Sequence, residues 1–339
     1  MRVADLRIGV LGAARIAPSA LVKPAQRVDG AVVAAVAARN PERARAFAAK
    51  HRIPRIHHDY QALIDDPDID AIYNPLPNGL HAQWTVAALR AGKHVLCEKP
   101  FAANAEQART VAQAQQEQQA VHGRPLVVLE AFHYRYHPLM RRVRELTAEI
   151  GPLRTIESTM CFPLPDFRDI RYQYPLAGGA LMDAGCYALH VLRHAVPDAG
   201  EPTVTAARAK LLSRDRRVDR AMTVEVRYDG GATGRARASM WSSSVLGIGF
   251  RVVGERGEVR VFNFVAPQVL HRLTSTVDGV RRRERVPGDS TYTYQLRAFV
   301  AAVGGDPAAN LTPPADSIAN MTLIDSAYDA AGLPRRGRV

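Results

Sequence analysis

Cysteine is scarce in this chain of 339 residues, and long apolar runs are missing. The three cysteines, Cys97, Cys161 and Cys186, are widely separated and form no CxxC pair. We therefore expect no disulfide framework and no metal site. A membrane-spanning helix needs about 20 apolar residues, and a strand-like run starts too early for a signal peptide. Both observations predict a cytoplasmic protein that does not bind membranes.

Lysine is also rare, although the net charge is +12 from 45 basic and 33 acidic residues. The lysines are Lys23, Lys50, Lys93, Lys99 and Lys210, so arginine supplies most of the positive charge. The arginines are spread along the chain and are dense only at 281–285 (RRRER), which is typical of a solvated hairpin or loop. This distribution does not favour a nucleic-acid partner, but a positive field would suit a phosphate-bearing cofactor.

The length predicts about two domains. Up to about residue 131, short apolar runs alternate with helical patterns, which predicts a doubly wound parallel sheet in an α/β fold. The expected strands are 7–11, 31–38, 71–74, 94–98 and 126–131, and the expected helices include 13–28, 41–51, 60–64, 81–91 and 105–120. We assign residues 1–131 to a nucleotide-binding domain and 132–339 to a domain for substrate binding and oligomerisation.

The second half of the chain has a different pattern. Turn signals separate β-rich runs at 203–212, 221–228, 234–241, 250–254 and 257–262, which predicts an antiparallel sheet. Helices are expected near 179–195, 293–303 and 315–331. The second domain is therefore expected to be α+β.

A glycine turn follows the first strand in the stretch from Ile8 to Ala17. The dinucleotide-binding pattern is G-x-G-x-x-G/A; here Gly12 supplies the tight turn, Ala14 replaces the second glycine and Ala17 fills the close-packing position. Free N–H groups at the helix start would bind a pyrophosphate. The predicted cofactor contacts are Gly12, Ala13, Ala14, Arg15 and Ile16. An ordinary strand–helix turn remains the alternative on these residues alone.

Arg39 follows the second strand, where an NAD site would place Asp or Glu to hold the ribose 2′-OH. A guanidinium suits a 2′-phosphate through paired hydrogen bonds. The sequence therefore favours NADP, with NAD as the alternative and a plain surface arginine as the competing interpretation.

Five stretches in order resemble the Gfo/Idh/MocA family of oxidoreductases. They are Asn74–His81 (NPLPNGLH), Glu98–Pro100 (EKP), Glu130–Pro138 (EAFHYRYHP), Gly178–Tyr187 (GGALMDAGCY) and Ala315–Met321 (ADSIANM). The resemblance implies a Rossmann domain followed by a domain with a large open antiparallel sheet, through which homodimers or homotetramers form. It also implies hydride transfer between a nicotinamide and a hydroxyl-bearing carbon of a sugar (aldose), polyol or dihydrodiol.

Three catalytic residues follow from this resemblance. The family lysine corresponds to Lys99, and the resemblance implies a cis Lys99–Pro100 bond that aims the lysine into the cleft. Asp183 and Tyr187 have i, i+4 spacing on one helix face. Tyrosine in the second position resembles the subgroup of dimeric dihydrodiol dehydrogenases, NADP-dependent D-xylose dehydrogenases and glucose–fructose oxidoreductase. A nearby ammonium would lower the pKa of a tyrosine from about 10, so Lys99 and Tyr187 would act as an acid–base pair, while Asp183 would bind a substrate hydroxyl or orient the pair.

Further contacts are implied by the resemblance. Pro75, Leu76, Asn78 and His81 would line the cofactor cleft, and Glu98 would touch the ribose or the nicotinamide amide. Arg135, Arg168 and Arg171 are open candidates for sugar hydroxyls or an acidic group, and His190 for core packing. A non-catalytic NADP-binding sensor on the same scaffold is the alternative function, and the sequence leaves open the substrate and the direction of reaction.

Overall fold

The computed structural model describes residues 5–196, 198–243 and 245–337. Backbone packing divides the chain into two compact units: the first runs to Tyr136 and adds Tyr292–Ile318, and the second contains His137–Thr291 and the chain from Ala319 onward. This division differs from the contiguous domains expected from the sequence. The segment after Tyr292 belongs to the first unit because Leu296 and Phe299 are buried in its core.

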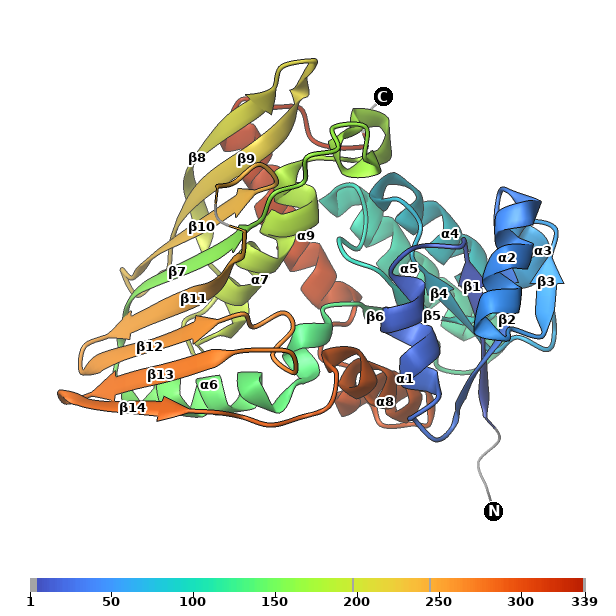
Figure 1. The fold of residues 1–339 in the computed structure, drawn as a ribbon, viewed down its shortest axis with the longest axis horizontal. Coiled ribbons are helices and arrows are strands. Elements are labelled where there is room, and N and C mark those ends of the chain that lie inside the picture. Colours follow the sequence, from blue (N-terminus) through green and yellow to red (C-terminus); the bar gives the residue numbers. More distant parts are fainter. Residues whose placement is uncertain (1–4, 197, 244, 338–339) are drawn as a thin grey trace. The chain divides into compact units, whose positions relative to one another are not determined.

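The first unit is built on a six-stranded sheet in which every pair is parallel (Figure 1). In spatial order the strands are β3 (Arg55–His57), β2 (Ala31–Ala37), β1 (Leu6–Leu11), β4 (Ala71–Asn74), β5 (His94–Cys97) and β6 (Val128–Glu130). This is the strand order of dinucleotide-binding folds, in which ligands bind where the order reverses, here between β1 and β4. Ile8, Val10 and Val36 are fully buried, as expected for a sheet covered on both faces. The predicted doubly wound sheet is confirmed.

Helices connect these strands as the sequence predicts. They are α2 (Pro41–His51), α3 (Tyr60–Ile64), α4 (His81–Arg90) and α5 (Ala105–His122), with short turns η2 (Asn78–Leu80), η3 (His133–Tyr136) and η7 (Pro307–Ala309), and α8 (Thr291–Val303) packs against the core. The helix expected over 13–28 is shorter. It is a π-helical turn, η1 (Pro18–Val22), followed by α1 (Lys23–Ala25), and Pro18 and Pro24 occupy first-turn positions where a missing N–H costs little.

The second unit contains an eight-stranded sheet (Figure 1). In spatial order the strands are β14 (Val280–Glu284), β13 (Arg272–Val277), β12 (Gly257–Phe262), β11 (Gly247–Gly254), β7 (Leu153–Cys161), β10 (Thr233–Ser239), β9 (Asp215–Arg227) and β8 (Thr203–Leu212). The sheet is mixed, because β7 and β10 pair in parallel while the other neighbours are antiparallel. The expected large antiparallel sheet is confirmed, with this one parallel pair inside it.

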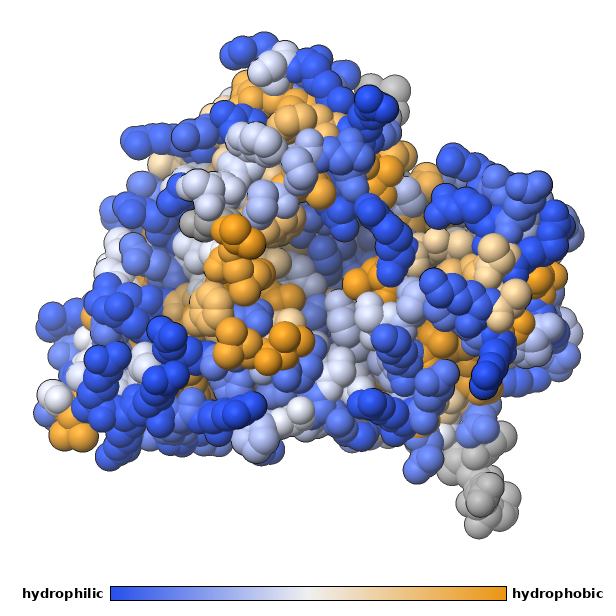
Figure 2. All heavy atoms as spheres, viewed as in Figure 1, coloured by the Kyte–Doolittle hydropathy of each residue, from blue (hydrophilic) through white to orange (hydrophobic). Residues whose placement is uncertain are grey.

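Helices cover one face of this sheet. They are α6 (Pro138–Glu149), the π-helical turn η6 (Leu181–Gly185), α7 (Cys186–His194) and the end of α9 (Pro314–Ala330). Two short turns, η4 (Ile170–Tyr172) and η5 (Tyr174–Leu176), lie between β7 and η6. Ile156 and Ser158 of β7 are buried, whereas Glu157 between them is exposed, which is the alternation of a sheet with one covered face. Figure 2 shows mostly hydrophilic side chains where β13 and β14 form the edge.

Candidate active site

The turn after β1 has the geometry that a glycine requires. Gly12 has φ +86°, a value that residues with a side chain rarely adopt. A Cβ at this position would lie 3.2 Å from Cδ2 of Leu76, and the Gly12 N–H donates to the Ala37 carbonyl at 2.6 Å. The turn is therefore closed against β2 and against the loop that follows β4, and its side-chain-free surface fits the close approach of a pyrophosphate. Ala13, Ala14 and Ile16 are partly buried beside it, and Arg15 is exposed.

A second arginine lies beside this turn. The Asn40 side chain caps α2 by accepting the N–H of Arg43 at 3.0 Å, and the Arg43 guanidinium donates to the Ala13 carbonyl at 3.2 Å. Arg39, the predicted 2′-phosphate ligand, is exposed in the same short segment. Sequence reasoning missed Arg43, although Asn40 followed by Pro41 signals a capped helix start and places Arg43 in the first turn after Arg39.

The end of β4 is fixed by buried polar contacts. The Asn74 side chain donates to the His81 carbonyl at 3.1 Å and to the Thr85 hydroxyl at 3.2 Å. The two ring nitrogens of His81 lie 2.7 Å from the carbonyl oxygens of Leu76 and Pro100. Burial is the main cause that lowers the His81 pKa, to about 4. His81 thus ties the strand end to the Pro100 segment, and its contact with a cofactor stays a prediction, as do those of Pro75 and Asn78.

Lys99 emerges from the end of β5, where the predicted cis Lys99–Pro100 bond is confirmed. The Glu98 carboxylate accepts the hydroxyl of fully buried Tyr73 at 2.7 Å. The next turn is held by Glu130, which accepts the Phe101 N–H at 2.8 Å. Strand ends and short loops thus place Gly12, Leu76, His81, Glu98 and Lys99 at one edge of the first unit's sheet.

Asp183 lies in the second unit, on η6. Its Oδ1 accepts Nε of Arg171 at 3.1 Å. Arg171 also donates to both oxygens of Asp169, each at 3.3 Å. These two carboxylates, Asp183 first, raise the pKa of the Arg171 guanidinium against the opposing effect of burial. The sequence left the role of Arg171 open; the structure shows that its guanidinium holds the Asp183 carboxylate.

Tyr187 occupies the first turn of α7, directly after the π-helical turn that carries Asp183. Its side chain is only 4% exposed. π-helical turns inside helices are frequent at functional sites, and this one was not predicted, because the local pattern resembles an ordinary helix. Asp183 and Tyr187 are brought together on one continuous helical segment of the second unit, and Lys99 belongs to the first.

Two of the three remaining candidates, Arg135 and His190, have local partners. Arg135 donates to the Leu311 carbonyl at 2.9 Å and lies 3.8 Å from Asp316, within the first unit. His190 is fully buried, and its ring centroid lies 4.5 Å from that of His194. Arg168 is exposed and stays an open candidate.

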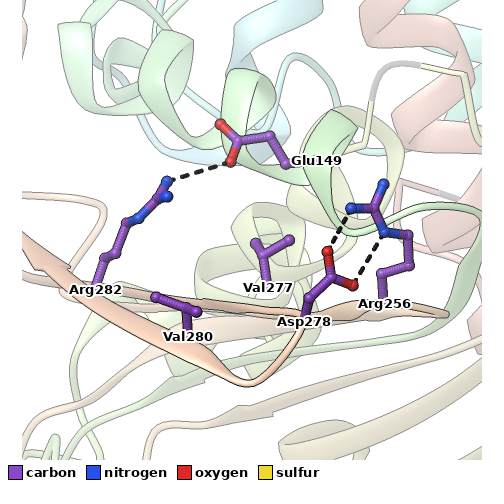
Figure 3. A pocket seen from close by; sticks show the side chains of 6 residues that line it. All are labelled: Glu149, Arg256, Val277, Asp278, Val280 and Arg282. Atoms are coloured by element: carbon purple, nitrogen blue, oxygen red, sulfur yellow. Dashed lines mark hydrogen bonds and ion pairs between the residues drawn. The ribbon is translucent and has the colours of Figure 1, made fainter.

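A pocket of about 380 Å³ in the second unit is separate from these residues (Figure 3). It is lined by Glu149, Arg256, Val277, Asp278, Val280 and Arg282. Its charged side chains face one another as ion pairs, with Arg256 Nε 3.1 Å from Asp278 and Arg282 3.7 Å from Glu149. Because these charges are already compensated, the pocket is a poor candidate for a catalytic site.

Comparison with known proteins agrees with this geometry. A family model described as an oxidoreductase family with an NAD-binding Rossmann fold matches residues 6–123, and a GFO/IDH/MocA C-terminal domain model matches residues 140–260. The chain is 35% identical over 333 residues to D-xylose 1-dehydrogenase (NADP(+)) 2 of Haloferax volcanii, with 96% of this chain and 97% of the relative covered.

Two further relatives act on nucleotide-linked sugars or were solved with nucleotides. The chain is 32% identical to dTDP-3,4-didehydro-2,6-dideoxy-α-D-glucose 3-reductase of Saccharopolyspora spinosa, with 98% of each chain covered. The structure of a 3-ketoreductase from Actinomadura kijaniata in complex with NADP and TDP-benzene superposes with a TM-score of 0.85 at 27% identity, covering 96% of this chain and 98% of the other. Matched along its length in sequence and in fold, the chain belongs to the Gfo/Idh/MocA family of oxidoreductases.

Proposed function

We propose that this protein is an NADP-dependent oxidoreductase that transfers hydride between the nicotinamide and a hydroxyl-bearing carbon of an aldose sugar. The observation that carries the proposal is the combination of Lys99 at the end of β5 with Asp183 and Tyr187 on one helical segment. The xylose dehydrogenase relative, aligned over 96% of this chain, supports an aldose and NADP. The first unit would bind the nucleotide and the second the sugar.

The proposed chemistry gives each side chain one task. When bound, NADP supplies the nicotinamide carbon that accepts or gives the hydride. Tyr187 takes the proton from the sugar hydroxyl during oxidation and returns it during reduction, and the Lys99 ammonium favours the phenolate by lowering the tyrosine pKa. Asp183, held by Arg171 at 3.1 Å, orients the sugar by accepting a neighbouring hydroxyl.

Arg39 and Arg43 form the proposed 2′-phosphate site. Both guanidinium groups are exposed at the start of α2, and Arg43 already contacts the glycine turn through the Ala13 carbonyl. Two cations on one short segment suit the doubly charged phosphate that distinguishes NADP from NAD. The glycine turn would hold the pyrophosphate of the cofactor, and Glu98 would contact its ribose or its nicotinamide amide.

A substrate panel tests the function directly. Purified protein is mixed with NADP and a series of aldoses, polyols and trans-dihydrodiols, and NADPH formation is followed at 340 nm; a dTDP-linked keto sugar is tested with NADPH in the reverse direction. We expect turnover with at least one aldose. Tight NADPH binding without turnover on any member would favour the alternative, a cofactor-binding sensor, and turnover on the dTDP-linked sugar alone would change the substrate class.

We also propose a homodimer through the uncovered face of the eight-stranded sheet, with a homotetramer as the larger assembly. That face carries side chains of both signs, including Arg235 at 3.8 Å from Glu157 and from Glu225. Alternating charges can pair with a second copy across a two-fold axis. Light scattering during size exclusion measures the mass, and Arg235→Glu should shift it toward the monomer. The cytoplasmic location stays a prediction; within the described residues, no helix is long and apolar enough to cross a membrane.

A further inference from the structure

The end of the chain holds a fully buried arginine. Arg336 is 0% exposed, a state that arginine reaches almost only when it is paired. Its guanidinium donates to the Asp219 carboxylate at 2.7 Å, to the Gly178 carbonyl at 2.7 Å and to the Pro334 carbonyl at 2.8 Å. Three acceptors in different directions use the planar fork of a guanidinium, which a lysine cannot reproduce.

Asp219 on β9 is the second half of this contact, and it is also fully buried. Its Oδ1 accepts the Tyr328 hydroxyl at 2.9 Å in addition to Arg336. Its Oδ2 accepts the backbone N–H of Leu181 at 2.7 Å. One carboxylate therefore joins the chain terminus, the end of α9 and the first residue of η6, all within the second unit.

Aromatic rings enclose the buried charge. The Arg336 guanidinium carbon lies 4.1 Å from the ring centroid of Tyr328 and 5.1 Å from that of Tyr174. The Tyr174 hydroxyl in turn donates to the Arg335 carbonyl at 3.2 Å. The terminal segment is thus fixed by its backbone as well as by its side chain.

The glycine pair at 178–179 makes room for this arrangement. A Cβ on Gly179 would lie 2.3 Å from Oδ1 of Asp219, and Gly179 has φ +145°. A Cβ on Gly178 would lie 2.7 Å from the Arg171 carbonyl oxygen. The buried pair therefore rests directly on the backbone that begins the helical segment. A larger residue at Gly179 would displace the pair, and one at Gly178 would displace the backbone of Arg171 and Gln173.

The same backbone leads to the proposed catalytic residues. The Gly179 carbonyl accepts the Asp183 N–H at 3.0 Å, and the Gly179 N–H donates to the Arg171 carbonyl at 2.8 Å. Arg171 closes the loop through its contact with Asp183. Holding Gly178 and Leu181 in place thus also holds Asp183 and, one turn later, Tyr187.

We propose that Arg336 and Asp219 form a C-terminal latch that positions the turn bearing Asp183 and Tyr187 for proton transfer. This inference rests on the proposed function. Both are positioning residues that act through the backbone of Gly178 and Leu181, and neither contacts the reacting atoms.

The kinetic test compares neighbouring arginines. Arg336→Ala should lower kcat about 10- to 100-fold, since small displacements of catalytic groups have effects of this size, while the KM for NADP changes less than about twofold because its proposed ligands lie in the other unit. Arg335→Ala is the matched control, because the Arg335 side chain carries the same charge and pairs with Asp325 and Asp329 of α9; its kcat should match that of the parent. Added guanidinium chloride, well below denaturing concentrations, should restore part of the rate of Arg336→Ala and leave Arg335→Ala unchanged.

If Arg336→Ala does not fold, the same kinetic comparison is made with Arg336→Lys. It keeps the charge but cannot reach all three acceptors, so we expect an intermediate kcat and little rescue by guanidinium. A folded Arg336→Lys or Arg336→Ala with the parental kcat would overturn the latch.

Amide hydrogen exchange separates this inference from the proposed function, since it needs no substrate. In the parent protein, the Leu181 amide should exchange as slowly as the amides of the central strands. In Arg336→Lys, peptides covering 178–187 should exchange faster, whereas peptides from the first unit should not change. Fast exchange at Leu181 in the parent would refute the latch even if the enzyme is active. Protection without turnover on any substrate would support the latch as a structural element and favour a cofactor-binding sensor over the proposed dehydrogenase.

Discussion

Lys99 and Tyr187 are the two side chains to which the proposed chemistry assigns the proton. Removing either one takes away an acid–base contribution of about 10²- to 10⁴-fold. We expect Tyr187→Phe and Lys99→Met each to lower kcat by that range, with the Kd for NADPH within about threefold of the parent, because the main nucleotide contacts remain. Initial rates with the best aldose and fluorescence titration of NADPH measure the two quantities.

The matched control for Lys99 is Lys50→Met, which removes a lysine from the exposed surface of α2. It should leave kcat within about twofold of the parent, as is usual for surface changes far from a site. Near-parental turnover in both Tyr187→Phe and Lys99→Met would contradict the mechanism.

Cofactor preference is also a property of single residues. Arg43→Ala and Arg39→Ala should each raise the KM for NADP about 10-fold or more, since each removes a charge-assisted contact to the 2′-phosphate, while the KM for NAD stays within about twofold. Arg45→Ala, on the exposed surface of the same helix, is the control and should change neither value. If Arg43→Ala and Arg39→Ala, like the control, keep the parental ratio of KM for NADP to KM for NAD, the 2′-phosphate must be bound by other groups.

For single residues, the sequence predicts a structural role where the amino-acid type itself indicates that role. Gly12 has the positive φ that its place in the turn requires, and the cis bond after Lys99 follows the family pattern. Asp219 and Arg336 could not be predicted, because they are 117 positions apart in the chain and only the folded sheet brings them together.

Helices and strands, like single residues, are predictable where local residues mark them and not where long-range contacts decide. The bounds of α2, α3, β4, β8 and β12 agree with the predicted ranges, because proline, glycine and capping residues mark their ends. The parallel pairing of β7 with β10 has no local signature, since it depends on which strands the topology places side by side. The segment from Tyr292 joins the first unit for the same reason, through long-range burial of Leu296 and Phe299.

The edge strand β14 shows how one element protects the sheet. The arginine-rich stretch expected to be a solvated hairpin or loop is a hairpin strand, paired with β13 through a turn at Asp278 and Gly279 that has positive φ at both residues. Arg281 and Arg283 are exposed along it. Charged side chains on an edge strand oppose pairing with another sheet.

Removing these charges should therefore promote association. We expect Arg281→Thr combined with Arg283→Thr to aggregate about twofold faster or more under mild heating, followed by light scattering. Substituting both positions with lysine keeps the charge and should leave the rate unchanged, and catalytic activity should be unaffected in both variants. Equal aggregation rates for the threonine and lysine variants would remove the edge charges from this explanation.

At the scale of the whole molecule, four buried histidines link stability to pH: His81, His94, His133 and His137. The N–H of Val127 donates to His94 at 3.0 Å and the N–H of Leu139 donates to His137 at 3.1 Å, so protonation at those nitrogens would break the contacts. Burial lowers the pKa of His94 and His137 to about 4, and burial with the Lys99 charge lowers that of His133 to about 3. Burial likewise lowers the pKa of His81 to about 4, against the opposing effect of the two carbonyl oxygens that its ring nitrogens face.

The sign of the effect follows from proton binding. An unfolded histidine has a pKa of about 6.5, so between pH 6.5 and 4 the unfolded chain binds protons that the native molecule does not. The stabilisation from the neutral histidines is complete above pH 6.5 and is lost as the pH falls toward 4, by roughly 1.4 kcal/mol per pH unit for each histidine.

Urea unfolding at pH 7.5, 6 and 5, followed by circular dichroism, should show a steep decline in the free energy of unfolding. His137→Asn should reduce that slope by about one proton, whereas His58→Gln, at a side chain that is 82% exposed, should leave it unchanged. Equal free energies at pH 5 and 7.5 would mean that folding does not lower the pKa of these histidines.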